Sequence, residues 1–275
     1  MSAFDPKRTS LTSDLWPVGG RFMQTCDRKD AIPIYVAIRL VSRQDRREPE
    51  MKLPSPLNLA LCACLLAAMA FTGEAHAQAK ENANFEAGIA AYHANDLPLA
   101  YKKFLAAAKE GHVDSQFNVA LMYEQGIGVG KDEKEAVVWY DKAASQGSAA
   151  AQFNLGVLYE NGRGTKIDFV RANEWYRKAS VQGDALAIGN LGMLYVRAQG
   201  VKENKIAGVA LLLVSAAGDP LPENHAKQNL AGIRGLTSEM AVAARALSEE
   251  LSRAKNLLVP LDQYLIESEN SIGKK

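Results

Sequence analysis

The chain has few cysteines, no excess of charge of either sign, and a single long apolar run. Its three cysteines, Cys26, Cys62 and Cys64, all precede residue 78 in a sequence of 275 residues. Lysine and arginine number 32 and aspartate and glutamate 31, which gives a net charge of +1. Balanced charge is untypical of a nucleic-acid-binding surface or an acidic tail. One apolar run excludes a polytopic membrane protein.

The apolar run belongs to a predicted secretory signal peptide at residues 51–77. Met51-Lys52 is a short positive start, residues 57–71 are uncharged and apolar, and Ala75-His76-Ala77 is a small-x-small cleavage site. We therefore expect cleavage after Ala77 and a periplasmic or secreted protein. Two alternatives stay open. One is a single membrane anchor, for which the apolar run is short, and the other is a lipoprotein with its lipid on Cys64.

The 50 residues before Met51 show no apolar periodicity, so we interpret residues 1–50 as a disordered extension or a translated stretch upstream of the true start. The mature chain would then run from Gln78 to Lys275 and contain no cysteine. A chain without thiols forms no disulfide, no thiolate metal site and no cysteine nucleophile.

Residue types recur every 36 positions through the middle of the chain. Tyrosines at this spacing are Tyr123, Tyr159 and Tyr195. A period of this length is typical of helical repeat arrays. The same spacing relates Asn118, Asn154 and Asn190; Gly128, Gly164 and Gly200; Trp139 and Trp175; Tyr140 and Tyr176; and Gly111, Gly147 and Gly183.

Each unit is predicted to form two helices joined by a glycine loop. In unit 148–183, small or apolar residues recur with helical spacing from Ala149 to Glu160, and residues 161–164 interrupt the pattern. Asp168 is then expected to cap a second helix over Phe169–Val181. Residues 78–111 are a shortened copy, with Pro98 in the first turn of the second helix.

The pattern N-L-G-x-L-Y-x-x-G-x-G, followed by A-x-x-W-Y-x-K-A and Q-G, is complete in unit 148–183. It resembles the Sel1-like repeat, a 36-residue relative of the tetratricopeptide repeat. The resemblance implies an all-α, right-handed α/α solenoid of helix–turn–helix repeats. We expect a tetratricopeptide-like repeat at 78–111 and Sel1-like repeats at 112–147, 148–183 and 184–219. The last departs in its second helix, where Leu211-Leu212 replaces the Trp-Tyr pair.

Residues 220–275 fall outside the repeat and are predicted to form a C-terminal helical cap and tail. A short helix is expected over 224–233 and a longer one from Thr237 to about Lys255. The tail beyond Tyr264 is expected to fray. A cap of this kind hides the last apolar face of a solenoid. The predicted buried face of the longer helix consists of Ala241, Ala244, Leu247 and Leu251.

Patterns typical of enzymes are weak in this sequence. The mature histidines, His93, His112 and His225, do not share a helical turn, so no metal site is predicted. Ser252-Arg253-Ala254-Lys255 has the form S-x-x-K without the partner motifs that nucleophile needs. Residues 126–130 are glycine-rich, but the repeat makes them a helix–helix turn rather than a phosphate loop. We predict no catalytic residue, no metal and no cofactor.

Two rows of residues are candidates for partner binding. In tetratricopeptide relatives the helix that carries Asn118, Asn154 and Asn190 faces the concave groove, where an amide can hold a ligand's backbone or carboxylate. Alternatively, these asparagines make hydrogen bonds within the repeat whether or not a ligand exists. The second row consists of the Trp-Tyr pairs, in which one member must pack. The regular spacing favours core burial of the other member as well, and a partly exposed anchor for a partner is the alternative.

These features predict a non-catalytic scaffold or regulator of the bacterial cell envelope that binds a peptide or protein in the concave groove. The resemblance implies a sensor-kinase outer domain or an envelope-assembly component as partner; neither a nucleic acid nor, for the mature form, a membrane is expected. One alternative is a hydrolase of cell-wall or β-lactam substrates, although Sel1-like proteins of that branch carry a disulfide in each repeat. Another is a cytoplasmic adaptor, if translation begins at Met1 and the protein is not exported.

Overall fold

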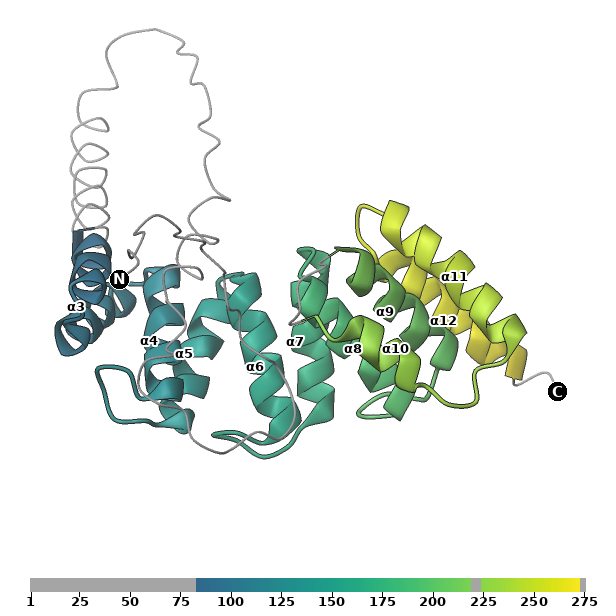
Figure 1. Ribbon diagram of the computed structural model, residues 1–275, viewed down its shortest axis with the longest axis horizontal. Coiled ribbons are helices and arrows are strands. Elements are labelled where there is room, and N and C mark those ends of the chain that lie inside the picture. Colours follow the sequence, from purple (N-terminus) through teal and green to yellow (C-terminus); the bar gives the residue numbers. More distant parts are fainter. Residues whose placement is uncertain (1–82, 219–223, 273–275) are drawn as a thin grey trace, which may run out of the picture.

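The structure is a computed structural model that describes residues 83–218 and 224–272. Every regular element in these ranges is a helix, and the helices stack side by side in an elongated array (Figure 1). The predicted signal peptide and the extension before it lie outside the described residues. The chain therefore folds as an α-solenoid of helix pairs.

Residues 83–93 are helical and precede the labelled helices. From α3 to α9, each helix packs on the next one in sequence, so the array is built from local contacts. The helices are α3 Leu97–Lys109, α4 Val113–Gln125, α5 Glu133–Ser145, α6 Ala149–Asn161, α7 Phe169–Val181, α8 Ala185–Arg197, α9 Lys205–Gly218, α10 Ala226–Gly232, α11 Ser238–Arg253 and α12 Leu258–Ile272. None of the helices in the described ranges combines the length and apolar character needed to cross a bilayer.

The helix ends follow the cap residues in the sequence. Asp168 precedes α7, and its carboxylate accepts a hydrogen bond from the backbone N–H of Arg171 at 3.0 Å, as predicted. At the other end of the preceding helix, Gly162 adopts a left-handed conformation with φ of 67°, which glycine reaches without steric cost. Each loop thus ends one helix and starts the next within seven residues or fewer.

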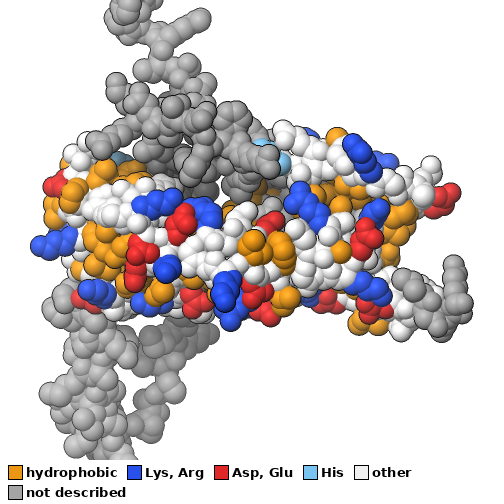
Figure 2. Space-filling view, turned by 90° about the horizontal axis from the view of Figure 1, so that it is seen from below, with side chains coloured by type: hydrophobic (Ala, Val, Ile, Leu, Met, Phe, Trp, Pro, Cys, Tyr) orange, Lys and Arg blue, Asp and Glu red, His pale blue; other side chains and the backbone are white. Residues whose placement is uncertain are grey.

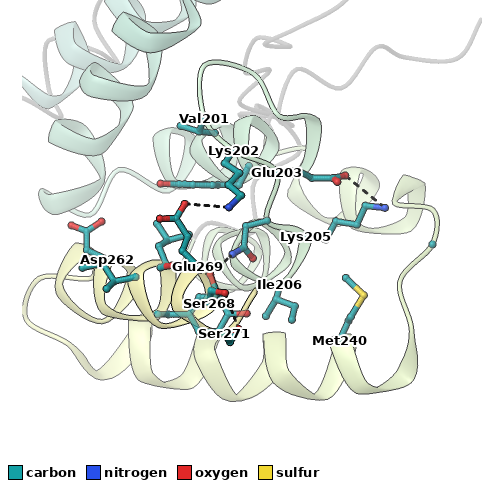
Figure 3. A pocket seen from close by; sticks show the side chains of 16 residues that line it. Val201, Lys202, Glu203, Lys205, Ile206, Met240, Asp262, Ser268, Glu269 and Ser271 are labelled. Atoms are coloured by element: carbon teal, nitrogen blue, oxygen red, sulfur yellow. Dashed lines mark hydrogen bonds and ion pairs between the residues drawn. The ribbon is translucent and has the colours of Figure 1, made fainter. Parts of the chain in front are cut away.

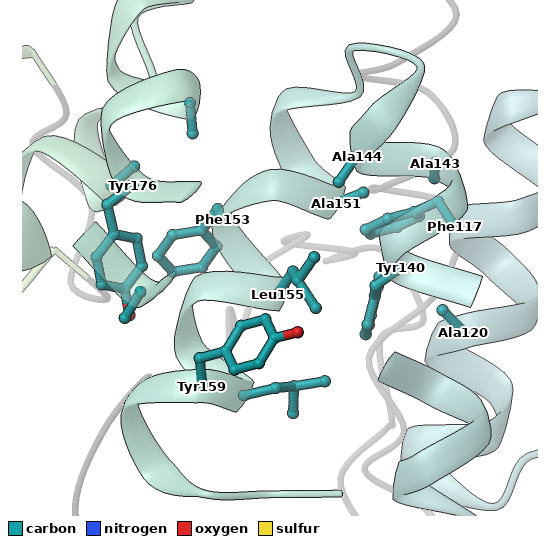
Figure 4. Packing of buried hydrophobic residues seen from close by; sticks show 14 of the residues in the cluster. Phe117, Ala120, Tyr140, Ala143, Ala144, Ala151, Phe153, Leu155, Tyr159 and Tyr176 are labelled. Atoms are coloured by element: carbon teal, nitrogen blue, oxygen red, sulfur yellow. The ribbon is translucent and has the colours of Figure 1, made fainter. Parts of the chain in front are cut away.

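The core between the two helices of the first two Sel1 repeats is filled by tyrosine. Tyr140 and Tyr176 have no exposed surface, and their rings lie 5.6 Å from Phe117 and 6.1 Å from Phe153 respectively (Figure 4). Close approach depends on small residues, because a Cβ added at Gly156 would come within 2.6 Å of the Tyr176 ring. The tyrosine is therefore the packing member of each Trp-Tyr pair.

The tryptophans differ from each other. Trp175 is half-buried, but Trp139 is 7% exposed. The interpretation of these aromatics as core residues is therefore confirmed for Trp139, and only Trp175 keeps partly exposed surface. The Trp139 ring belongs to the main apolar cluster, whereas Trp175 is only partly buried against it. A lysine lies over each ring, Lys142 at 3.7 Å from Trp139 and Lys178 at 3.8 Å from Trp175.

Consecutive repeats are joined through the second glycine of each loop. Gly164 has a φ of 67°, and a Cβ at this position would overlap the backbone at Glu133, the first residue of α5. Gly200 meets the backbone of Phe169, the first residue of α7, in the same manner. The 36-residue glycine spacing thus reflects one backbone-to-backbone contact that recurs along the solenoid.

The C-terminal cap corrects two expectations. α11 packs on α9, and its buried residues include Ala244, Leu247 and Leu251, whereas Ala241 is exposed. The chain beyond Tyr264 is helical rather than frayed, since α12 continues to Ile272. Buried Leu261 and polar contacts to the repeats hold α12 in place.

Candidate functional site

The first helices of the repeats, α4, α6 and α8, share one face that is partly covered in α6 and α8 but in α4 only at Leu121, because Asn118 is 1% exposed. Between residues 151 and 159 of α6, every side chain is buried except Asn154 and Val157. Between residues 187 and 195 of α8, only Asn190 and Met193 escape burial. A spacing of three residues puts both members of each pair on the same side of the helix. We call the six residues at these positions the amide–aliphatic stripe: Asn118, Leu121, Asn154, Val157, Asn190 and Met193.

The three asparagines of the stripe have different hydrogen bonds. Asn154 donates through Nδ2 to the carbonyl of Ala150 at 3.0 Å, within its own helix. Asn190 donates to the hydroxyl of Tyr176 at 3.1 Å. Neither Nδ2 nor Oδ1 of Asn118 has a hydrogen-bond partner within the described part of the chain, although its side chain is 1% exposed. The three asparagines are equally spaced in the sequence but differ in their hydrogen-bond partners.

Asn118 lacks the hydrogen bond of Asn190 because the preceding unit carries a different residue at the contact position. The tyrosine that Asn190 contacts stands 14 residues before it in the sequence, and the residue 14 before Asn118 is Phe104. Phe104 is fully buried and carries no hydroxyl to accept the amide. An unpaired buried amide typically costs about 1–3 kcal/mol, so Asn118 carries a penalty that Asn154 and Asn190 avoid.

Acidic side chains near the stripe are already engaged within each repeat. Tyr140 donates its hydroxyl to Glu124 at 2.8 Å, and Tyr176 donates to Glu160 at 2.6 Å. Burial raises the pKa of both tyrosines well above its ordinary value, with the neighbouring carboxylate as a second cause. Arg163 forms an ion pair with Glu124 at 2.8 Å. These groups tie helices together and are not available as acids or bases.

The tyrosine–glutamate hydrogen bond is absent from the last repeat, because both of its residues are replaced there. The positions of Glu160 and Tyr176 are occupied 36 residues later by Val196 and Leu212. Replacing both partners of a buried hydrogen bond avoids leaving either one unpaired. This hydrogen bond was not predicted from the sequence, although the glutamate and the tyrosine both recur at the 36-residue spacing.

The residues considered for chemistry have structural contacts. His112 accepts a hydrogen bond from the N–H of Ser115, and Ser252 donates to the carbonyl of Ser248. Gly126 ends α4 in a left-handed conformation, so the glycine-rich segment is a helix–helix turn as predicted. Within residues 83–218 and 224–272, histidine, cysteine, aspartate and glutamate form no cluster of three that could hold a metal ion.

A second candidate is a cleft of about 1000 Å³ at the C-terminal end. Figure 3 shows Ile206 at the start of α9, Met240 at the start of α11 and Ser268 of α12 among its lining residues. The charged groups that line it pair with one another or with the repeats: Lys202 with Glu269 at 3.6 Å, Lys205 with Glu203 at 3.7 Å, and Asp262 with Arg177 at 2.6 Å. The cleft thus offers a ligand no unbalanced charge.

The outer surface is mixed in charge. Figure 2 shows the face seen from below the view of Figure 1, where positive, negative and apolar side chains alternate over the repeats. Long-range attraction to a strongly charged partner is therefore weak.

Comparison with known proteins agrees with the repeat pattern. A family model of the Sel1 repeat matches residues 113–148, 149–184 and 185–219. A search of curated proteins found no match.

Two solved structures are similar to this chain. The crystal structure of a Sel1 repeat protein from Oxalobacter formigenes shows 37% identity over 49% of this chain and 54% of that chain, with a TM-score of 0.45. The crystal structure of c5321, a protective antigen of uropathogenic Escherichia coli strains with an SLR fold, shows 27% identity over 74% of this chain and 49% of that chain, with a TM-score of 0.49. The chain therefore spans about half the length of each.

Proposed function

We propose that this chain, a Sel1-repeat protein by its three consecutive repeats, is a non-catalytic interaction scaffold that binds a peptide segment of a partner protein along the amide–aliphatic stripe. Sel1 repeats generally serve as protein-interaction scaffolds, which supports the general role. The binding location and the class of partner proposed here are more specific than that general role. They rest on the residues of the stripe and on the predicted export signal.

The observation that carries the proposal is the unpaired amide of Asn118 beside the partly covered aliphatic residues. An asparagine side chain offers one acceptor and two donor hydrogens, which complement the N–H and C=O of a peptide unit. Leu121 lies one helical turn from that amide and remains half-buried. A bound segment would cover the aliphatic side chain, and the buried Asn118 side chain would have to rotate toward it to gain a hydrogen bond; both changes favour binding.

We further propose that the protein acts in the bacterial cell envelope after removal of residues 51–77. The partner would be the outer domain of a sensor kinase or an envelope-assembly component, because both present peptide segments outside the cytoplasm. No cofactor takes part in such binding. The alternatives are a hydrolase acting on cell-wall or β-lactam substrates and a cytoplasmic adaptor, and the experiment below separates them.

In-cell crosslinking of a C-terminally tagged chain, followed by mass spectrometry, tests the proposal. We expect the recovered protein to begin at Gln78 and to carry one envelope protein in stoichiometric yield. Changing Asn118, Asn154 and Asn190 together to Ala should remove that partner while the circular dichroism spectrum stays helical. The matched control changes three amides of the cap, Gln228, Gln263 and Asn270, to Ala.

Each outcome has a distinct meaning. Unchanged capture by the triple stripe variant would refute the role of the asparagines. A processed chain that captures no protein would favour the hydrolase. A recovered chain that retains residues 1–50 and binds a cytosolic protein would refute export and favour the cytoplasmic adaptor.

A further inference from the structure

The first helices of the three Sel1 repeats begin with different cap residues. The N-cap residue is Ser148 for α6, Asp184 for α8 and His112 for α4. In each case the side chain accepts a hydrogen bond from the backbone N–H three residues later. The N-to-acceptor distances are 3.1 Å for Ser115 to His112, 3.3 Å for Ala151 to Ser148, and 2.8 Å for Ala187 to Asp184.

Only the histidine cap can be switched off near neutral pH. A serine hydroxyl does not titrate in this range, and an aspartate carboxylate ordinarily stays ionised well below pH 6. The imidazole of His112 accepts through Nδ1 only while that nitrogen carries no proton. Protonation replaces the acceptor with a donor that faces the N–H of Ser115, so the ring loses the cap and keeps only the Ser115 hydroxyl, 2.9 Å from Nδ1, as a partner. It also places a positive charge at the positive end of α4.

His112 lies at the joint between the first unit and the first Sel1 repeat. Its ring centroid is 4.4 Å from that of Phe85, which is 7% exposed and belongs to the helix over 83–93. In the same joint, Gln116 donates to the carbonyl of Ala108 at the end of α3. Release of the cap would therefore act on the contacts that hold the first unit to α4.

The surroundings disfavour a proton on this ring. Burial lowers the pKa of His112 below its ordinary value. The attraction of nearby carboxylates does not reverse this lowering. The titratable and charged residues of the elements packed here are Glu86 and His93 on the helix over 83–93, Tyr101, Lys102, Lys103, Lys109 and Glu110 on and just after α3, and Asp114 in the first turn of α4.

We infer that His112 makes this joint acid-sensitive: the neutral ring caps α4 and packs on Phe85, and the protonated ring loosens the first unit from the first Sel1 repeat. The joints capped by Ser148 and Asp184 lack this response. Asn118 stands three residues after Ser115 on the same helix, so acidification would reach the stripe at its unpaired amide.

Hydrogen–deuterium exchange of the full chain at about pH 7.5 and about pH 5 tests the inference. Protection factors, which correct for the intrinsic pH dependence of exchange, are compared for residues 113–118 and for the equivalent residues 149–154. We expect protection of 113–118 to fall about tenfold at the lower pH, as for the loss of an N-cap, while 149–154 keeps its protection. In His112→Ser, which carries the cap of the next repeat, the fall should disappear.

An equal fall in the wild type and in His112→Ser would overturn the inference, and so would a wild type without any fall. The reverse variant Ser148→His provides an independent check if His112→Ser folds poorly. It should transfer part of the acid sensitivity to residues 149–154. Failure of this transfer, with the wild-type segment 113–118 also insensitive, would again contradict the assignment.

Discussion

Replacing Gly164 with Ala should destabilise the solenoid more than the same change at Gly147. Both glycines have positive φ, 67° and 97° respectively, so alanine at either position costs about 1–2 kcal/mol for the left-handed backbone. Only at Gly164 would the added Cβ overlap the backbone at Glu133, whereas nothing lies within 4 Å at Gly147. Backbone displacement of this kind typically costs a further amount of about 1–3 kcal/mol.

Urea unfolding followed by circular dichroism measures the difference between these two variants. The free energy of unfolding should fall by about 1–3 kcal/mol more for Gly164→Ala than for Gly147→Ala. The corresponding difference in Tm is about 2–4 °C for each kcal/mol in a folded unit of this size. Equal effects of the two variants would refute the backbone-to-backbone contact between repeats, because both substitutions carry the cost of a positive φ and only Gly164→Ala adds the overlap with Glu133.

Three further predictions follow from individual contacts. Tyr176→Phe should lower the free energy of unfolding by about 1–3 kcal/mol in urea unfolding, because the substitution removes a charge-assisted hydrogen bond to Glu160. The free energy of unfolding should decrease as the pH falls below about 6.5, because the unfolded chain binds the proton that folded His112 disfavours; His112→Ser should flatten this slope. Asp262→Asn should increase hydrogen exchange in residues 258–272 while changing global stability by less than about 1 kcal/mol, because the ion pair with Arg177 is partly exposed.

The repeat period predicted the local structure well because helix ends depend on nearby residues. The second helix of unit 148–183 begins and ends at Phe169 and Val181, as expected, and Asp168 caps it. These features follow from cap residues and loop glycines within one unit. They need no information about how distant helices pack.

Features that depend on packing between units were not predictable in the same way. The isolation of the Asn118 amide results from Phe104, which lies in another unit and has no hydroxyl. The difference in burial between Trp139 and Trp175 and the exposure of Ala241 depend on how neighbouring helices are placed laterally. The apolar pattern of a single helix does not specify which of its residues a neighbouring helix will cover.

The central claim is that the partner binds along the amide–aliphatic stripe. Its most direct test places a photo-crosslinking amino acid at Val157 on the stripe and, in a second protein, at Val138, which is 46% exposed on α5. We predict an adduct with one envelope protein from position 157 but not from position 138, and its loss when Asn118, Asn154 and Asn190 are changed to Ala. An adduct from position 138 alone, or one from position 157 that survives the triple substitution, would contradict this account.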